Sequence, residues 1–352
     1  MERARVFVLQ GYYGTGNFGD DWLLAASIAA LAAASPGARF IVRDHGDAIA
    51  IAAQSCVTFT GSERVLGDAA SSRAARLWRY ATEAWRQFGR ADWLVFGGGT
   101  QFHAGGGVAS LALNALLCLL ARLRGVRVAL LGCGIKEIDG PLARALLAFV
   151  IRSAHVVVVR DAASRAIAGP RALLAADLAF TAPLPRPAAR GDSLALAVYP
   201  PAWTDALADA IGRAAATRPV VLLTVQREGV TRGDEAALGD LAARLGRAVA
   251  RRDLVDPAAA FAGVGLVCGM RFHALLAAAQ AGLPFVGIAH DPKIADLCTR
   301  FSMPFLDPDT LTAEALTAAL ETAAALRPSD AALARCRAEA EHGLSAMAEA
   351  LA

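Results

Sequence analysis

Near its start the chain reads Val6-Phe7-Val8-Leu9-Gln10-Gly11-Tyr12-Tyr13-Gly14-Thr15-Gly16-Asn17-Phe18-Gly19-Asp20-Asp21, and this stretch decides the fold. The apolar run at 6–9 is typical of a buried strand, and the glycines after it suit a tight turn. Residues 22–34 have the composition and spacing of a helix. A strand, a glycine-rich turn and a helix are the first step of a parallel α/β sheet, so we predict a doubly wound α/β protein.

The same alternation continues along the first half of the chain. Gly97-Gly98-Gly99-Thr100 closes one apolar run and Gly132-Cys133-Gly134 closes another, so three glycine turns follow strands here. The pattern further predicts strands at 39–42, 93–96, 126–131 and 156–159, and helices at 71–88, 109–123 and 141–153.

A proline-rich segment interrupts this alternation and indicates a linker. It carries Pro183, Pro185, Pro187 and Gly191. We therefore predict an N-terminal lobe over 1–182, a linker over 183–192, a C-terminal lobe over 193–310 and closing helices over 311–352. Two α/β lobes joined by a hinge imply a cleft between them.

Composition excludes several classes of protein. With 352 residues, 56% hydrophobic and 19% charged, the chain is long enough for two domains and too apolar for intrinsic disorder. The mean hydropathy of +0.42 comes largely from alanine, and the apolar stretch 108–121 is shorter than the roughly 20 residues of a membrane span. The net charge of +3, without a basic block, argues against a nucleic-acid partner. We expect a cytoplasmic chain.

The six cysteines are far apart in sequence and form no Cys-x-x-Cys pair, so we expect reduced packing residues and no metal site.

Several residues of the first lobe follow strands, where open α/β sheets bind ligands. Gly14-x-Gly16-x-x-Gly19 fits a dinucleotide-binding turn, although only Asp44 is a loose candidate for the acidic residue that such a site needs. Asp20 fits a helix cap or a hydroxyl-binding group, and His103 fits a solvated loop or a site. Arg160 fits a salt bridge with Asp161 or a fork for an anion.

Cations follow two strands of the second lobe. Gly269-Met270-Arg271-Phe272-His273 follows one strand and opens a helix, and His290-Asp291-Pro292-Lys293 follows the next. A histidine at such a place often caps the helix or satisfies the core. Arg271, His273 and Lys293 together instead indicate an anion site at helix N-termini.

These motifs resemble one family, the polysaccharide pyruvyl transferases, in particular the branch that pyruvylates cell-wall glycopolymers. The resemblance covers about residues 6–300 and rests on seven blocks: Gly11-Tyr12-Tyr13-Gly14, Asn17-Phe18-Gly19-Asp20, Gly97-Gly98-Gly99-Thr100, Val159-Arg160-Asp161, Gly269-Met270-Arg271-Phe272-His273-Ala274-Leu275, Gly282-Leu283-Pro284-Phe285-Val286-Gly287-Ile288 and Asp291-Pro292-Lys293.

The resemblance implies a GT-B-like pair of Rossmann-type lobes facing a cleft, with phosphoenolpyruvate as donor and no cofactor. It implies a ketal-linked pyruvate placed on a sugar. The sugar can be free or lipid-linked, and the protein would act in the cytoplasm or at the inner face of the membrane. We expect catalysis by His273 with Arg271 and Lys293, the donor site at Arg160, Arg271, Lys293 and Gly269, and acceptor contacts from Tyr13, Asn17, Asp20, Gly98, Gly99, Thr100 and His103.

Two departures leave alternatives open. After the triple glycine the family commonly has a Ser or Thr and then a Leu-rich or Gln-Asp segment, whereas this chain has Gln101-Phe102-His103. After the first strand of the second lobe, family members often carry an arginine, whereas this chain has Tyr199-Pro200-Pro201-Ala202-Trp203. Arg227 could take the place of that arginine. The rival hypotheses are a nucleotide-sugar glycosyltransferase, with Asp256 or Asp291 holding the ribose, and a non-catalytic glycan-binding protein. Oligomeric state is not indicated.

Overall fold

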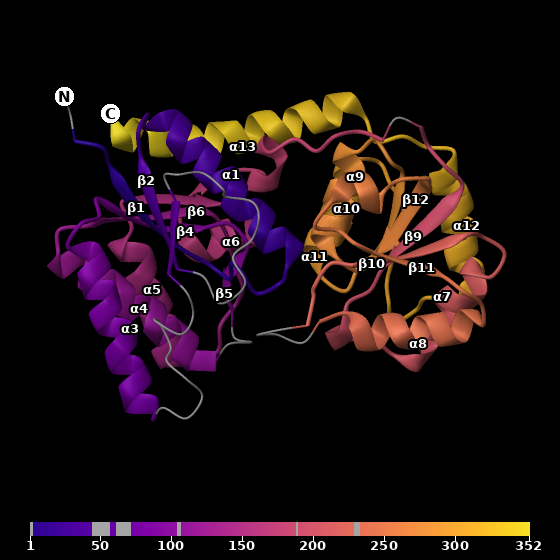
Figure 1. Cartoon of the computed structure of the whole chain (residues 1–352), viewed down its shortest axis with the longest axis horizontal. Coiled ribbons are helices and arrows are strands. Elements are labelled where there is room, and N and C mark those ends of the chain that lie inside the picture. The colour runs from indigo at the N-terminus through magenta and orange to yellow at the C-terminus, as the bar shows by residue number, and fades with distance from the viewer. Residues whose placement is uncertain (1–2, 44–56, 61–71, 104–106, 188, 229–232) are drawn as a thin grey trace. The chain divides into compact units, whose positions relative to one another are not determined.

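The computed structural model describes residues 3–43, 57–60, 72–103, 107–187, 189–228 and 233–352. It divides into two compact units, and the chain passes between them more than once. The first unit holds residues 1–15, 20–182 and 336–352, and the second holds 16–19 and 183–335. Figure 1 shows each unit as a sheet with helices packed against it. The candidate residue Asp44 lies outside the described residues.

The first unit is built on a parallel sheet of order β3-β2-β1-β4-β6-β7-β8, with β5 paired to the end of β6. Its strands are β1 Val6–Gln10, β2 Arg39–Arg43, β3 Val57–Thr60, β4 Trp93–Gly97, β5 Thr100–Phe102, β6 Arg127–Ile135, β7 Val156–Val159 and β8 Leu173–Leu174. Its helices are α1 Phe18–Ala34, α3 Arg73–Phe88, α4 Gly107–Leu123, α5 Pro141–Ser153 and α6 Ala162–Ala168.

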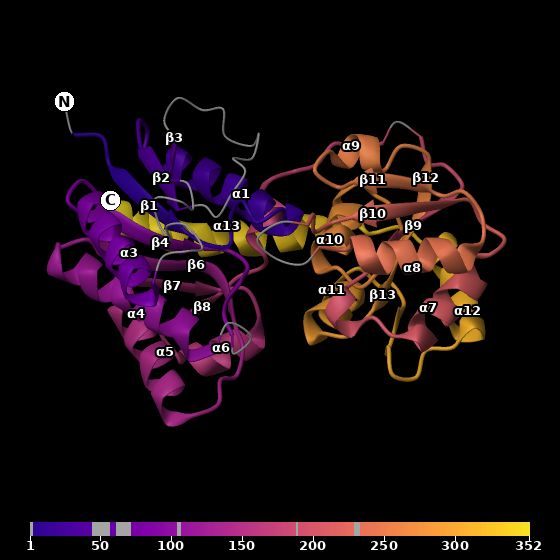
Figure 2. The same ribbon diagram turned by 60° about the horizontal axis from the view of Figure 1, so that its bottom comes forward.

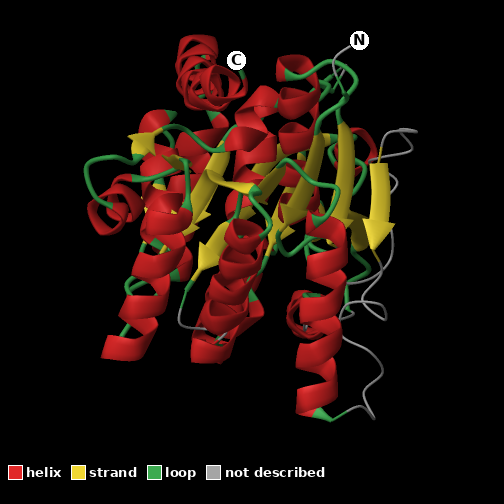
Figure 3. Cartoon of the chain, turned by 90° about the vertical axis from the view of Figure 1, so that its left-hand side faces the viewer, coloured by secondary structure: helices red, strands yellow, loops and turns green. Residues whose placement is uncertain are grey.

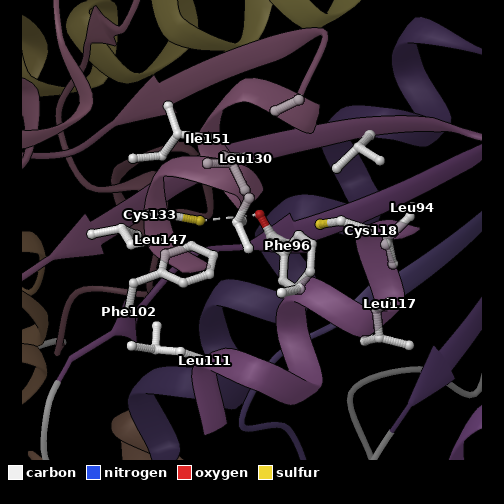
Figure 4. Packing of buried hydrophobic residues seen from close by; sticks show 14 of the residues in the cluster. Leu94, Phe96, Phe102, Leu111, Leu117, Cys118, Leu130, Cys133, Leu147 and Ile151 are labelled. Carbon is white, nitrogen blue, oxygen red and sulfur yellow. Dashed lines mark hydrogen bonds between the residues drawn. The ribbon is translucent and has the colours of Figure 1, made fainter. Parts of the chain in front are cut away.

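Helices cover both faces of this sheet, which explains why its strands are continuously apolar. Figure 2 shows α3, α4 and α5 along one face, and Figure 3 shows helices on either side of the strands. In the core under α4 and α5, the rings of Phe96 and Phe102 pack with centroids 5.6 Å apart, and Leu111 and Leu147 lie beside Phe102 (Figure 4). The carbonyl oxygen of Phe96 accepts from Cys133 Sγ at 3.2 Å.

The second unit has the same kind of parallel sheet, of order β11-β10-β9-β12-β13-β14. Its strands are β9 Ser193–Ala197, β10 Val220–Thr224, β11 Ala250–Asp253, β12 Val264–Gly269, β13 Phe285–Ile288 and β14 Phe305–Leu306. Its helices are α7 Asp205–Ala215, α8 Glu235–Leu245, α9 Pro257–Ala260, α10 Phe272–Gln280, α11 Pro292–Arg300 and α12 Ala313–Ala324, and it begins α13 Asp330–Leu351, which ends in the first unit.

Both sheets confirm the predicted doubly wound α/β class, and two local predictions are wrong. Gly132-Cys133-Gly134 is not a turn, because β6 continues through it to Ile135. The pairing of β6 with β7 shifts register between Leu130 and Cys133, and Gly132 has φ 68°, which glycine adopts readily in a bulge. The first helix begins at Phe18 rather than Trp22, because Asn17 Oδ1 accepts the Gly19 N–H at 2.9 Å and caps it. The cap expected from Asp20 is therefore supplied by Asn17.

Five cysteines are free and buried, as predicted, whereas Cys56 lies outside the described residues. Burial raises the pKa of Cys118, Cys133, Cys268 and Cys298 to about 12. These thiols serve packing. In the described part of the chain, no helix is long and apolar enough to span a membrane.

Candidate functional site

The strand order of the second sheet marks a place for a ligand. β9 and β12 are neighbours in the sheet, yet the chain leaves them toward opposite edges, to β10 and to β13. In sheets of this kind, ligands bind outside the carboxyl ends of the two strands at such a switch point. Val198-Tyr199 follows β9 here, and Met270-Arg271-Phe272-His273 follows β12. The residues singled out from the sequence thus lie where the topology favours a site.

Arg271 is held at this point by three neighbours. Its Nε donates to the carbonyl oxygen of Val198 at 3.1 Å, and its Nη2 donates to Asp234 Oδ1. Its guanidinium lies over the Tyr199 ring, 4.8 Å from the centroid. The Arg271 side chain keeps 13% of its surface exposed while Asp234 has none, so this ion pair is largely shielded from water.

Asp234 also anchors the loop after β10. Its Oδ2 accepts the N–H groups of Val225 at 3.0 Å and Gln226 at 2.9 Å. The sequence did not single out Asp234, because an acidic residue before a helix ordinarily suggests a cap. The structure shows that it joins the ends of β10 and β12 through Arg271.

His290 is a further aromatic side chain of the site, and it stacks on Tyr199. Its ring is 4.5 Å from that of Tyr199, at an interplanar angle of 19°. Burial lowers the pKa of His290, although the adjacent Asp291 acts in the opposite direction. Arg271, Tyr199 and His290 are therefore linked by ring contacts at the ends of β12, β9 and β13.

His273 is contacted by a segment from the beginning of the chain. A Cβ added to Gly19 would lie 2.0 Å from His273 Nδ1, so only glycine permits this approach. The segment 16–19 is fixed to the second unit by backbone hydrogen bonds from Phe18 N to the Val225 oxygen at 3.0 Å and from Arg227 N to the Gly16 oxygen at 2.9 Å. Asn17, predicted on the acceptor side of the first lobe, instead pairs with Gln226 of the second unit.

Lys293 lies at the start of α11 in the same unit. Its Nζ is 3.6 Å from Asp291 Oδ2 and 5.9 Å from the centroid of the Phe272 ring. Asp291 caps α11 by accepting the Lys293 N–H at 3.2 Å. Gly269 has a packing role, because a Cβ there would lie 3.1 Å from that of Ala197 on β9. Phe272, which Lys293 faces, immediately precedes His273.

In the first unit, the glycine turn after β4 packs tightly against α1. A Cβ on Gly98 would lie 2.7 Å from Leu23 Cβ, and one on Gly99 would lie 2.9 Å from Asp20 Oδ1. Tyr13 is fully buried and its hydroxyl donates to the carbonyl oxygen of Gly97 at 2.7 Å. Tyr13 thus serves the fold, and we leave it out of the acceptor site.

Arg160 is buried in the first unit and pairs mainly with a residue other than Asp161. Its Nη1 donates to Asp177 Oδ2 at 2.9 Å and its Nη2 to Thr100 Oγ1 at 2.6 Å. Asp161 Oδ2 is 3.9 Å from Arg160 Nε, while its Oδ1 caps α6. The structure thereby joins Arg160 to Thr100 after the glycine turn. His103 lies near Tyr12, with ring centroids 6.1 Å apart.

The two acidic residues weighed for a ribose are both helix caps. Asp256 accepts from Ala258 N and Ala259 N at the start of α9, and Asp291 caps α11. Arg227, weighed as a replacement cation, pairs with Asp253 across 3.7 Å on a half-exposed surface.

Comparison with solved structures shows the fold. The UDP-GlcNAc 2-epimerase from Neisseria meningitidis has a TM-score of 0.61 and 9% identity, over 98% of this chain and 100% of that one. The UDP-GlcNAc 2-epimerase from Methanocaldococcus jannaschii has a TM-score of 0.63 and 7% identity, over 98% and 99%. The glycotransferase of kitacinnamycin has a TM-score of 0.54 and 12% identity, over 99% of both chains. The fold is therefore GT-B-like, with two Rossmann-type units.

Comparison with curated proteins finds no match. Comparison with family models matches residues 17–292, most of the chain, to the polysaccharide pyruvyl transferases. This range contains the arginine and histidine that come after β12, and it ends one residue before Lys293. The chain belongs to the polysaccharide pyruvyl transferase family.

Proposed function

We propose that this protein transfers the pyruvyl group of phosphoenolpyruvate to a sugar of a cell-surface polysaccharide or its precursor, as a ketal, with release of phosphate. One observation carries the proposal: in a chain of this family, Arg271 and His273 stand at the switch point of the second sheet. Lys293 starts the helix after the neighbouring strand β13. This set suits a donor that carries a carboxylate and a phosphate.

The donor site would be built from groups of the second unit. Arg271 is oriented by Asp234 and the Val198 carbonyl, so its planar fork is fixed before a ligand arrives. A preformed guanidinium binds a carboxylate or phosphate without the entropic cost of ordering the side chain. Lys293 would add a second positive charge and stabilise the phosphate as it leaves.

The chemistry needs one proton donor and two sugar hydroxyls. His273 would give a proton to the methylene carbon, which becomes the methyl group, while one sugar oxygen attacks the adjacent carbon. The first sugar hydroxyl would give its proton back to His273. Phosphate would leave as the bond between the same carbon and the phosphate oxygen breaks, and the second hydroxyl would then attack this carbon, closing the ketal and passing its proton to the released phosphate. A diol and phosphoenolpyruvate thus yield a cyclic ketal and phosphate, and no redox or metal chemistry is required.

Acceptor contacts would come from the first unit and from the segment 16–19. Thr100 and His103 follow β4, and Asp20 of α1 lies beside Gly99 in the same turn. These three side chains offer hydroxyl-binding groups. Arg160, which we predicted in the donor site, would act through Thr100 because it is buried and paired with Asp177. Since phosphoenolpyruvate is a cytoplasmic metabolite, we place the reaction in the cytoplasm, on a free or lipid-linked acceptor.

The test is ligand-induced thermal stabilisation followed by turnover. We expect phosphoenolpyruvate, but not a panel of nucleotide sugars, to raise the melting temperature of the wild-type protein, since a ligand that binds the folded state stabilises it. With a sugar acceptor, His273→Gln should abolish phosphate release while it still binds the donor, and Asp253→Asn serves as the control. Stabilisation by a nucleotide sugar alone would favour glycosyl transfer. Full activity of His273→Gln would show that His273 is not the acid.

A further inference from the structure

The first unit contains a second basic site that the proposed reaction does not use. A pocket of about 570 Å³ lies at the amino ends of β6 and β7, between the last turns of α4 and α5. The candidate acceptor residues lie at the opposite end of the sheet, where Arg160 follows the carboxyl end of β7 and donates to Thr100. Four arginines and one histidine line the pocket: Arg122, Arg127, Arg152, Arg171 and His155.

Negative side chains do not balance these arginines. The lining includes no aspartate or glutamate, and within the described residues none of the four arginines forms an ion pair with a carboxylate. Arg244 of the second unit shows the contrast, because it pairs with Asp205, Asp209 and Asp240. The pocket therefore keeps a positive charge that the protein itself does not neutralise.

Helix ends explain only part of this charge. Arg122 and Arg152 lie in the last turns of α4 and α5, where each helix presents roughly half a negative charge. With the end of α13, whose Ala350 carbonyl oxygen accepts from Arg127, three helix ends together offset about one and a half of the four positive charges. Arg127 and Arg171 contact helix ends as well, at the carbonyl oxygens of Ala350 in α13 and Ala154 after α5, and part of the positive charge still remains on the pocket.

Three lining side chains are held in place by the fold. Arg171 Nη2 donates to the carbonyl oxygen of Ala154 at 2.5 Å, and Arg127 Nη1 donates to that of Ala350 at 3.0 Å. His155 Nδ1 accepts the Val128 N–H at 3.2 Å, which places the proton of the neutral ring on Nε2. A guanidinium has five N–H donors, so each of these arginines keeps donors for a ligand.

We propose that this pocket binds a phosphate-bearing anion, as a phosphate or diphosphate group, at a site distinct from the donor site. Its volume lies within the range of about 300–1,000 Å³ that small-ligand sites occupy. Arginine forks match phosphate oxygens in geometry, and an excess of about two to three charges suits a group with more than one negative charge. The group comes either from a free phosphorylated molecule or from an anionic lipid headgroup.

The experiment measures binding of inorganic pyrophosphate by calorimetry in the Arg271→Gln protein, where binding at the donor site is weakened. We expect one saturable site, with an affinity that falls roughly tenfold or more when Arg122→Gln and Arg152→Gln are added. The matched control adds Arg79→Gln and Arg144→Gln, which remove the same charge from exposed arginines of α3 and α5 outside the pocket. Equal losses in the two proteins, or no saturable binding, would overturn the proposal.

Two further arms complete the test. If the pocket variant, which carries Arg122→Gln and Arg152→Gln, does not fold, amide exchange of the Arg271→Gln protein decides. Protection at 122–128 and 152–155 on adding pyrophosphate supports the site, and unchanged exchange there overturns it.

Sedimentation with vesicles of phosphatidylglycerol or phosphatidylcholine identifies the source of the phosphate group. Binding to phosphatidylglycerol alone, lost in the pocket variant, points to a headgroup, and pyrophosphate binding without vesicle binding points to a free ligand. Failure of the pyruvyl transferase assay would leave this result untouched.

Discussion

Two arginine–aspartate pairs of the second unit differ in how much water reaches them. The Arg271–Asp234 pair is 13% and 0% exposed, whereas Arg227–Asp253 is 46% and 42% exposed. Breaking a buried pair leaves a charge without its partner and costs about 3–5 kcal/mol, whereas an exposed pair contributes about 0–1 kcal/mol. We therefore expect Asp234→Asn to lower the free energy of unfolding by several kcal/mol more than Asp253→Asn, measured by urea denaturation.

The Asp234→Asn substitution mainly affects the contact with Arg271, because a carboxamide keeps one oxygen that accepts hydrogen bonds. Its oxygen can still accept from Val225 N and Gln226 N, but its NH₂ group would then face the Arg271 Nη2 donor. Phosphoenolpyruvate binding should weaken as well, because Arg271 loses its fixed orientation. Equal unfolding free energies for the two variants would show that the buried pair has no special weight.

His290 supplies a pH dependence whose sign follows from its surroundings. Burial lowers its pKa in the folded protein, so between that value and the ordinary pKa of about 6.5 the unfolded chain binds a proton that the folded chain does not. The contribution of neutral His290 to the free energy of unfolding is thus fully present above about pH 6.5, and it is lost as the pH drops from there through the lowered pKa of the folded protein. We expect His290→Gln to flatten this fall in denaturation midpoints measured from pH 7 downward. His342→Gln, at an exposed position of α13, should leave the wild-type slope, and an unchanged slope in His290→Gln would refute the assignment.

At the scale of elements, strands, helices and the residues directly after strands could be predicted from local sequence. Continuous apolar runs ending in glycine or a cation marked β1, β4, β12 and β13, so Arg271, His273 and Lys293 were found together. The sequence does not predict β3, β5, β8, β11 and β14, because these segments are short or, as in Ala250–Asp253, polar. Asp234 was missed because its role depends on contacts with Val225 and Arg271, which sequence spacing does not encode.

The segment 16–19 shows the same limit. The sequence pattern assigns its glycines to a turn of the first lobe, whereas the backbone pairs with Val225, Gln226 and Arg227 of the second unit. Pairing between residues about 200 positions apart leaves no local pattern. The glycine at position 19 nevertheless has a physical reason, which is the approach of the His273 ring.

Gly19→Ala tests that approach. The added Cβ would lie 2.0 Å from His273 Nδ1, so the ring or the start of α1 must move. Since displacing a catalytic group by about 1 Å can cost on the order of 100-fold in rate, we expect kcat to fall at least tenfold. The control is Gly239→Ala in α8, where the nearest atom is 3.8 Å away; it should keep full activity and gain about 0.5–1 kcal/mol of stability. Normal kcat in Gly19→Ala would mean that His273 tolerates the shift.

At the scale of the whole molecule, the two sheets share one connectivity. In each, the first strand lies between the second and the fourth, which creates a switch point in both units. The two units differ in the residues that stand after the strands at that point. Glycines packed on α1 stand in the first and cations in the second, which is why an acceptor role suits one and an anionic donor suits the other.

The last helix belongs to both units and gives a prediction about their stability. From Cys336 onward α13 packs on the first unit, where Met347 is 1% and Leu351 4% exposed, and a Cβ on Gly343 would lie 2.9 Å from Val158 of β7. Burying each of these two large side chains contributes about 1.5–3 kcal/mol. Ending the chain after Arg335 should therefore speed amide exchange in β6 and β7 by at least tenfold, because their outer face loses its cover. Exchange in β12 and α10, which keep their own neighbours in the second unit, should stay near the wild-type rate. Faster exchange in both units alike would instead mean that the two unfold as one cooperative body.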